Sequence, residues 1–154
     1  MNCQETKAIM ETRVRSNELN LHHTLFGGAI ASYMDTTASI AAEKYCHERT
    51  VTASIDRLDF HSPAIEGEII RCEAYVTGKG NRSFEIYITL DVIETDSKRK
   101  RKIASAFVTF VLLQPKALPE IHPNTKEEKK ICSLYNERKK LSRQMRGTYY
   151  DELP

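Results

Sequence analysis

A pair of glycines and one acid lie close together in an otherwise apolar stretch of the chain. Residues 17–35 read NELNLHHTLFGGAIASYMD. Gly27 and Gly28 at the start of a helix would expose backbone N–H groups, and the helix dipole adds positive potential there. An oxyanion would be stabilised at such a position. Together with Asp35 as a base, these donors are typical of hydrolysis of an acyl group by water.

Asp35 belongs to a helix that the sequence predicts from about Gly27 to Cys46, because the segment is rich in small and apolar residues and lacks proline. On a helical wheel Asp35 shares a stripe with small residues, namely Gly28, Ala31, Ala38 and Ala42. An unpaired buried charge would cost several kcal/mol, so the acid must meet water, a partner group or a ligand. The competing interpretation is that Asp35 accepts hydrogen bonds from a neighbouring strand and only holds the helix in place.

The composition narrows the classes of protein to which the chain could belong. The 154 residues predict one main domain, and a net charge of +2 does not suggest a nucleic-acid binder. Four widely spaced cysteines form no CxxC pair, so we expect no metal site and reduced thiols. The N-terminus lacks an apolar signal region, and no segment approaches 18 uninterrupted apolar residues. We therefore expect a cytoplasmic protein with no membrane contact.

The remaining pattern predicts strands on both sides of this helix and a helix at the end of the chain. Hydrophobic content and turn signals predict strands at about residues 6–15, 51–61, 68–77, 83–93 and 103–113. The segment 83–93 alternates most clearly, with Phe84, Ile86, Ile88, Leu90 and Val92 on one face. Asn124 or Thr125 could cap one last polar helix that runs to about Arg146. We divide the chain into a domain of residues 1–123 and a basic helical extension of residues 124–154.

This order of elements predicts an α+β fold. Successive hairpins form an antiparallel sheet, and a helix that is apolar on most sides needs cover on most sides. A curved antiparallel sheet wrapped around one long central helix, with a C-terminal helical tail, satisfies both conditions. That layout is the hotdog fold.

The motif N-x-x-x-x-L-F-G-G, followed by a helix that carries Met-Asp, resembles the acyl-CoA thioesterase branch of the hotdog superfamily. The later segments VTASIDRLDFHSP, GKGNRSFEI and ASAFVTFVLL are similar to the second strand, the hairpin and the last strand of that family. The resemblance covers about residues 8–130. It implies hydrolysis of a fatty acyl-CoA to free fatty acid and CoA without any cofactor, since coenzyme A is part of the substrate.

The resemblance also implies roles for four residues. Asn20 and Asp35 would form the site from opposite partners of a homodimer, and Gly27 and Gly28 would polarise the thioester carbonyl. Asp35 would act as a general base on water or as a nucleophile that forms a mixed anhydride. Asn20 would orient the water or the carbonyl.

One position departs from the family, which commonly has glycine three residues after the asparagine, where this chain has His23. If that position needs φ > 0, histidine tolerates it less well than glycine, and the loop around Asn20 could differ in shape. His22 and His23 could also be catalytic bases or metal ligands, although no third ligand lies nearby at a recognised spacing. Solvated loop histidines remain the alternative.

Three phosphate groups of CoA call for cations or N–H groups. We expect Asn81, Arg82 and Ser83, after a glycine turn, to contact the CoA, as the family resemblance implies. Residues 98–102 (KRKRK) could be a phosphate clamp or simply a charged hairpin tip, and basic residues of the last helix could also reach the nucleotide. The acyl chain would lie near Phe60 and Met34, which could equally be core residues.

An unpaired sheet edge is usually covered in native proteins. Edge-to-edge pairing of two copies predicts a homodimer, and the family resemblance implies further assembly into a trimer of dimers. Two other functions stay open: a non-catalytic acyl-CoA-binding regulatory protein, and a hotdog hydratase or dehydratase that would use histidine.

Overall fold

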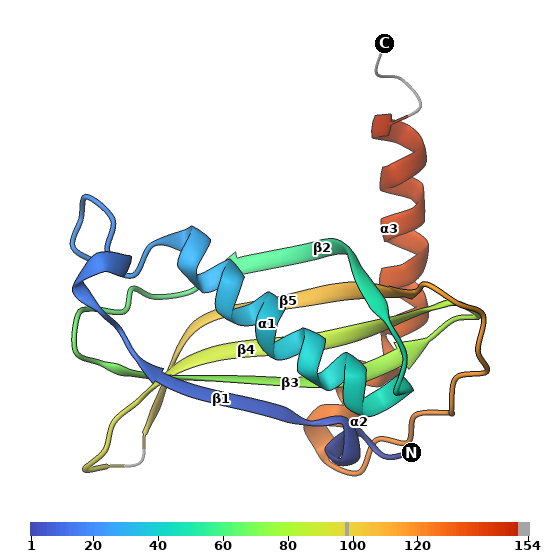
Figure 1. Cartoon of the computed structure of the whole chain (residues 1–154), viewed down its shortest axis with the longest axis horizontal. Coiled ribbons are helices and arrows are strands. Elements are labelled where there is room, and N and C mark those ends of the chain that lie inside the picture. Colours follow the sequence, from blue (N-terminus) through green and yellow to red (C-terminus); the bar gives the residue numbers. More distant parts are fainter. Residues whose placement is uncertain (98, 151–154) are drawn as a thin grey trace.

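A five-stranded antiparallel sheet curves around one long helix in the computed structural model (Figure 1). The structure describes residues 1–97 and 99–150, and side chains as far as residue 146. The strands are β1 (Ala8–Arg13), β2 (Thr50–Phe60), β3 (Ile69–Lys79), β4 (Ser83–Ile93) and β5 (Lys100–Leu112), in the spatial order β1-β3-β4-β5-β2. The helices are α1 (Gly27–Cys46), α2 (Lys126–Ser133) and α3 (Tyr135–Tyr150), and short 3-10 turns span Cys3–Thr6 and Ser16–Glu18. The predicted α+β hotdog architecture is confirmed.

Both ends of α1 lie where the sequence predicts them. The helix begins at Gly27, directly after Phe26, which keeps an extended backbone. It ends at Cys46, because His47 adopts a left-handed conformation with φ +52° and donates its N–H to the Glu43 carbonyl at 2.9 Å. This closing bond satisfies a carbonyl of the last turn.

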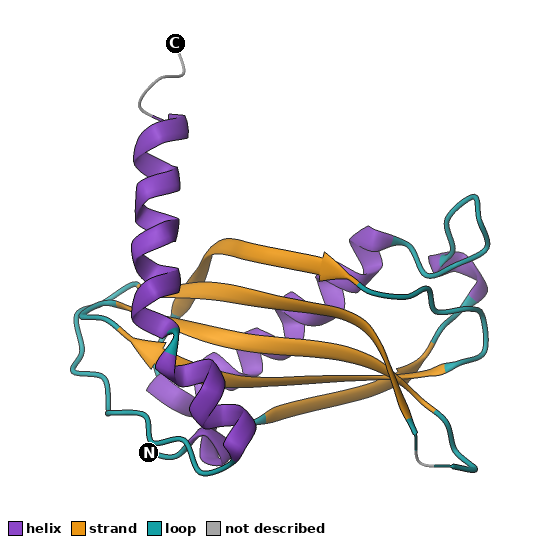
Figure 2. Cartoon of the chain, turned by 180° about the vertical axis from the view of Figure 1, so that it is seen from behind, coloured by secondary structure: helices purple, strands orange, loops and turns teal. Residues whose placement is uncertain are grey.

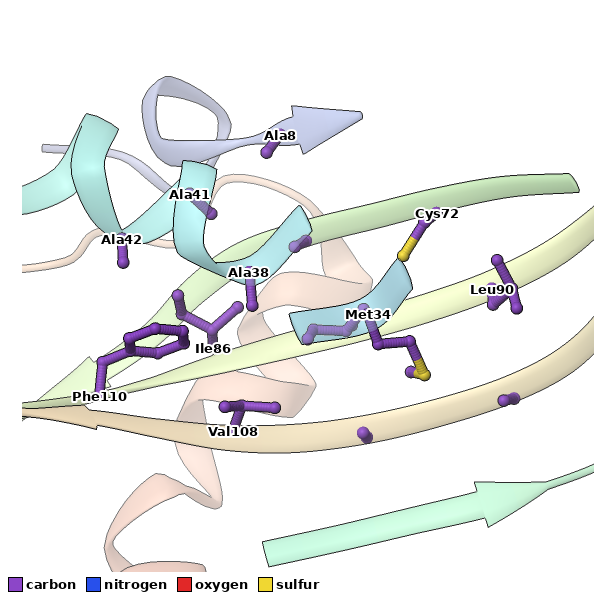
Figure 3. Packing of buried hydrophobic residues seen from close by; sticks show 14 of the residues in the cluster. Ala8, Met34, Ala38, Ala41, Ala42, Cys72, Ile86, Leu90, Val108 and Phe110 are labelled. Atoms are coloured by element: carbon purple, nitrogen blue, oxygen red, sulfur yellow. The ribbon is translucent and has the colours of Figure 1, made fainter. Parts of the chain in front are cut away.

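The core lies between α1 and the concave face of the sheet. Alternate residues of β4 point towards the helix, and all five of the predicted inward residues are buried: Phe84, Ile86, Ile88, Leu90 and Val92. From α1, Met34, Ala38 and Ala41 meet this face (Figure 3). The small residues of α1 allow the helix to approach the sheet closely.

The edge strand β2 differs from the central strands because large apolar side chains are exposed along it. Val51, Ile55 and Phe60 are 45%, 40% and 59% exposed. Its only partner among the described residues is β5, with register shifts between Thr52 and Ser54 and between Ile55 and Arg57. One long edge of the sheet therefore presents both apolar side chains and unpaired backbone groups.

Two predictions about the elements are wrong: the start of one strand and the continuity of the last helix. The strand β5 begins at Lys100 rather than at Ile103, because Lys100 and Lys102 pair in register with Ile93 and Asp91 of β4. The predicted single C-terminal helix is broken at Leu134, where φ is −92° and ψ is 2°. After the break, α3 crosses the convex face of the sheet and projects past β2 (Figure 2).

A buried ion pair is among the contacts that hold this C-terminal pair of helices on the convex face. Arg138 donates two hydrogen bonds to the carboxylate of Glu85, at 2.7 and 3.0 Å, and its guanidinium lies 4.1 Å from the ring centroid of Phe107. Tyr135 packs on Gly78, where an added Cβ would meet the tyrosine ring at 2.3 Å. Gly78 therefore permits the close approach of α3 to the sheet.

Candidate active site

Asp35 lies half-buried on α1 and faces the edge strand β2. Thr52 donates a hydrogen bond from its hydroxyl to Oδ1 of Asp35 at 2.7 Å. No ion pair to this carboxylate occurs among the residues with described side chains, and its Oδ2 accepts no hydrogen bond from them. The acid is therefore anchored by one oxygen and keeps the other available.

Sequence reasoning missed Thr52. It is one of two threonines near the start of β2, and nothing in its immediate neighbours distinguishes it from Thr50. Only the packing of α1 against β2 brings it to the acid.

The first turn of α1 carries backbone donors without acceptors. The N–H groups of Gly27, Gly28 and Ala29 find no acceptor among the described residues, and the first intrahelical bond runs from the Ile30 N–H to the Phe26 carbonyl at 3.1 Å. Phe26 supplies no side-chain cap, and the first turn holds no acid. Together with the helix dipole, these free donors form a site suited to a negatively charged oxygen.

Aromatic rings flank the two glycines. An added Cβ at Gly27 would lie 3.5 Å from Cζ of Phe60, whereas at Gly28 it would lie 2.3 Å from the ring of Phe26. Phe60 is thus not a core residue but an exposed side chain beside the donors, whereas Met34 is fully buried in the core. An apolar group bound near Gly27 would contact Phe60.

Asn20 organises the loop that precedes α1. Its Oδ1 accepts hydrogen bonds from the backbone N–H of His22 at 2.9 Å and of Thr24 at 3.2 Å. Its Nδ2 donates to the Thr24 hydroxyl at 3.0 Å. The amide carries a second N–H with no described acceptor, so Asn20 holds its loop together and retains one donor.

His23 occupies the position where glycine is common in the family, and its φ is +59°. The loop therefore keeps the left-handed turn that glycine would favour, with a histidine in the strained position. Both His22 and His23 are exposed. No cluster of three or more potential metal ligands occurs in the described part of the chain.

Within one chain the predicted site residues fall into two separate groups. Gly27 and Asp35 are eight residues apart on α1, which is about 12 Å along the helix axis. Thr52 pairs in register with Phe110 near one end of β5, whereas Phe60 pairs with Ala104 near the other. One group contains the predicted Asp35 and its unpredicted partner Thr52, and the other contains the predicted Asn20, Gly27, Gly28 and Phe60.

The β3–β4 hairpin carries Asn81, Arg82 and Ser83 at the end of the sheet that also holds Thr52. Asn81 and Arg82 are exposed, and Arg82 donates to the Leu112 carbonyl at 3.3 Å. A side chain at Gly80 would meet Nζ of Lys139 at 2.7 Å, so α3 brings this lysine beside the hairpin. Burial, and then the charge of Arg143, lower the pKa of Lys139.

In the other basic cluster, residues 98–102, two cations are paired with carboxylates. Lys98 lies outside the described residues. Lys100 binds Glu73 at 2.8 Å, and Arg101 binds Glu68 at 2.6 Å. These two cations stabilise the sheet rather than form a free clamp.

The convex face of the sheet holds two cavities, of about 450 and 570 Å³, on either side of α2. Neither is lined by Asn20, Asp35, the two glycines or the hairpin residues. In the described part of the chain, no helix is both long and apolar enough to cross a bilayer.

Comparison with known proteins agrees with this geometry. The sequence model of the thioesterase superfamily matches residues 22–95. A Bacillus subtilis protein named as the uncharacterized acyl-CoA thioester hydrolase YkhA is 37% identical over 130 residues, 82% of this chain and 76% of that protein. The cytosolic acyl coenzyme A thioester hydrolase of mouse is 33% identical over 123 residues, 76% of this chain, but the match spans only 32% of the mouse protein.

Solved structures extend the likeness over nearly the whole chain. An acyl-CoA hydrolase from Staphylococcus aureus in complex with butyryl-CoA, CoA and CoA disulfide has a TM-score of 0.91 and 28% identity, covering 99% of this chain and 96% of that one. An apo-hexameric acyl-CoA thioesterase has a TM-score of 0.89 and 29% identity, covering 94% and 96%.

Three variants of the Staphylococcus aureus hydrolase carry alanine in place of one asparagine, one aspartate and one threonine. In that protein the aspartate follows the asparagine by 15 residues, and the threonine follows the aspartate by 17. Asn20, Asp35 and Thr52 have the same two separations. By sequence, fold and the spacing of these polar residues, the chain belongs to the thioesterase superfamily, as a hotdog-fold member grouped with the acyl-CoA thioester hydrolases.

Proposed function

We propose that this chain hydrolyses fatty acyl-CoA thioesters with Asp35 as the general base. The observation that carries the proposal is the Asp35 carboxylate, which Thr52 holds by one oxygen while the other has no described partner. Because Asp35 is only half-buried, this second oxygen can meet water. It can accept a proton from a water molecule that attacks the thioester.

In this mechanism the free N–H groups of Gly27 and Gly28 bind the carbonyl oxygen and stabilise the negative charge that develops on it. Asp35 takes the proton of the attacking water and returns it to the sulfur of CoA as the thiolate leaves. Asn20 uses its remaining N–H to orient the water or the carbonyl. Direct attack by Asp35 to form a mixed anhydride is the alternative, which water would then hydrolyse.

Two copies are needed to complete such a site. Within one chain, the donors and the acid are about 12 Å apart along α1. If two β2 edges pair antiparallel about a two-fold axis near the middle of the strand, the Phe60 end of one strand lies opposite the Thr50 end of the other. This pairing brings Asn20, Gly27 and Gly28 of one copy towards Asp35 of its partner.

The exposed apolar residues of β2 support this homodimer, because pairing would cover Val51 and Ile55. A relative that is hexameric supports further assembly into a trimer of dimers. We assign the hotdog domain to residues 1–123 and the basic helical extension to residues 124–154, of which residues 151–154 are outside the description.

For the CoA moiety we propose Asn81, Arg82 and Ser83, joined by Lys139 of α3. Arg82 and Lys139 have no carboxylate partner among the residues with described side chains, so their charges are available to phosphates. The acyl chain would pass Phe60. We propose no metal, cofactor, nucleic-acid or membrane partner, and a cytoplasmic location, in line with the cytosolic name of the mouse relative.

The experiment is release of free thiol from a panel of acyl-CoAs of increasing chain length. We expect turnover by the wild type and a kcat lower by about 100-fold or more in Asp35→Ala and Asp35→Asn. Asp35→Asn is the matched variant, because it keeps the size and the hydrogen bond from Thr52. Unchanged rates would remove Asp35 from the mechanism, and binding without turnover in the wild type would favour an acyl-CoA sensor.

A further inference from the structure

Two thiols from opposite ends of the chain lie in contact. Sγ of Cys3, in the first 3-10 turn, is 3.8 Å from Sγ of Cys132, in α2. The two residues are separated by 129 positions in the sequence. A disulfide has an S–S length of about 2 Å, so the two sulfurs would have to approach by roughly 2 Å to bond.

The backbones that carry these thiols are held firmly together. The N-terminal amine donates to the Glu120 carbonyl at 3.0 Å, and the His122 N–H donates to the Met1 carbonyl at 3.0 Å. One turn before Cys132 on α2, the buried Glu128 accepts a hydrogen bond from the side chain of Gln4. The same face of α2 therefore meets the N-terminal turn through two successive contacts, of which one is the thiol pair.

The other cysteines provide an internal comparison. Cys46 is buried and donates its S–H to the Ala42 carbonyl at 3.1 Å, and Cys72 is buried in the core. Neither has a thiol neighbour among the described residues. Cys3 is fully buried and Cys132 is only partly so, which makes Cys132 the more accessible residue of the pair.

The electrostatics of the pair agree with an attacking role for Cys132. The hydrogen bond between the two thiols lowers the pKa of Cys132, whereas the same contact, and then burial, raise the pKa of Cys3. The thiolate is the reactive form of cysteine, so the less buried member of the pair is also the one with the larger thiolate fraction.

We propose that Cys3 and Cys132 are a reversible disulfide site that responds to low-molecular-weight disulfides. The Cys132 thiolate attacks one sulfur of the reagent, forms a mixed disulfide and releases one thiol. The Cys3 sulfur then attacks the Cys132 sulfur and displaces the second thiol. The protein loses two electrons and two protons, and the reagent disulfide gains both as two thiols.

The bond would connect the N-terminal turn to α2 and close a loop of about 130 residues. It would thereby fix the helices that cover the convex face, including α3, without touching Asp35. In a reducing compartment the pair stays a dithiol, and it closes when the ratio of disulfide to thiol rises. The expected consequence is a more stable oxidised protein with unchanged catalytic residues.

The test treats the wild type, Cys3→Ser, Cys132→Ser and Cys46→Ser with oxidised glutathione, followed by intact mass, peptide mapping without reductant and thermal unfolding. We expect the wild type and Cys46→Ser to become lighter by two hydrogens and to melt higher by about 5–10 °C, reversibly with dithiothreitol. Cys3→Ser should stop at a glutathione adduct on Cys132, and Cys132→Ser should not react.

Any of four results would overturn the proposal: a persistent glutathione adduct in the wild type, an unchanged mass in the wild type, a disulfide that involves Cys46, Cys72 or a second chain, or no rise in melting temperature on oxidation. Activity should be followed by loss of thioester absorbance, because the aromatic disulfides used to detect released thiols would themselves oxidise the pair. Turnover of the oxidised protein should stay within about twofold of the reduced protein, since the disulfide lies outside the site.

Discussion

The hydroxyl of Thr52 lies 2.7 Å from Oδ1 of Asp35 and joins the edge strand β2 to the central helix α1. The contact orients a carboxylate that has no cation beside it among the residues with described side chains. It also connects the proposed general base to the strand through which a second copy would pair. The position of the acid therefore depends on how β2 is held.

Replacing Thr52 tests whether this hydrogen bond positions the acid. Thr52→Val keeps the shape of the side chain and removes the donor, so we expect kcat to fall by about 10- to 100-fold, the range for a hydrogen bond to a charged group. Thr52→Ser keeps the hydroxyl and should retain most of the activity. Steady-state kinetics with one acyl-CoA measures both, and circular dichroism checks the fold. Equal losses in the two variants would point to packing rather than to the hydroxyl.

Mixing two inactive variants tests whether the site is shared between copies. Asp35→Ala and Asn20→Ala, co-expressed with different tags and purified through both, would form heterodimers with one intact pair of Asn20 and Asp35. We expect activity well above either parent, up to about half that of the wild type, because a two-fold axis creates two equivalent sites. A site built within one chain would give no recovery.

The periodic elements were predictable because their signals are local. The alternation from Phe84 to Val92 identified β4 and its buried face, and the run of small and apolar residues gave both ends of α1. The break at Leu134 was missed because no glycine or proline marks it. It follows from contacts of Tyr135 and Arg138 with the sheet, which are distant in sequence.

The site was predictable only in part, because some of its contacts join segments that are distant in the sequence. The family motif pointed to Asp35, but the partner Thr52 is 17 residues away on another element. The position of β2 at the sheet edge likewise depends on strand order, which hydrophobic pattern alone does not determine. The sequence predicts the start of β5 too late because a charged residue such as Lys100 is typical of a turn, whereas its charge is paired with Glu73 on the outer face of the sheet.

His23 offers a test of loop strain, because its φ of +59° is unfavourable for a residue with a Cβ. The left-handed conformation costs about 1 kcal/mol or more, which glycine avoids, although glycine loses more entropy on folding. We expect His23→Gly to be more stable than the matched variant His22→Gly by about 1 kcal/mol, because His22 has no positive φ to relieve. Denaturant unfolding measures the difference. A His23→Gly variant less stable than His22→Gly would show that the histidine side chain stabilises the loop.

Arg82 of the β3–β4 hairpin and Lys139 of α3 should bind the phosphates of CoA and should not contact the thioester. Arg82→Gln and Lys139→Gln should each raise KM for acyl-CoA by about 10-fold with little change in kcat, as expected for loss of a charge-assisted hydrogen bond. An acyl thioester of N-acetylcysteamine, which lacks the phosphates, should show no such difference. Lys140→Gln, an exposed neighbour, is the control variant. Equal effects on both substrates would place these cations outside the phosphate site.

Glu73 makes the stability of the fold depend on acid pH. Its carboxylate receives Lys7 at 2.5 Å, Arg71 at 2.6 Å and Lys100 at 2.8 Å, and its side chain is 14% exposed. Burial alone would raise the pKa of Glu73, but hydrogen bonds from Lys100 and Lys7 lower it to about 2.

Because the pKa of Glu73 is lower in the folded chain than in the unfolded chain, its contribution is complete above about pH 4.5 and is lost as the pH falls towards 2. We expect that loss to be on the order of 2 kcal/mol, since Lys100 is partly solvated. Denaturant unfolding of the wild type and Glu73→Gln between pH 2 and 7 measures it. The two proteins should differ most near neutral pH and converge near pH 2, because protonated Glu73 resembles the amide. A gap between them that stays constant over this range would show that the three cations do not hold Glu73 ionised.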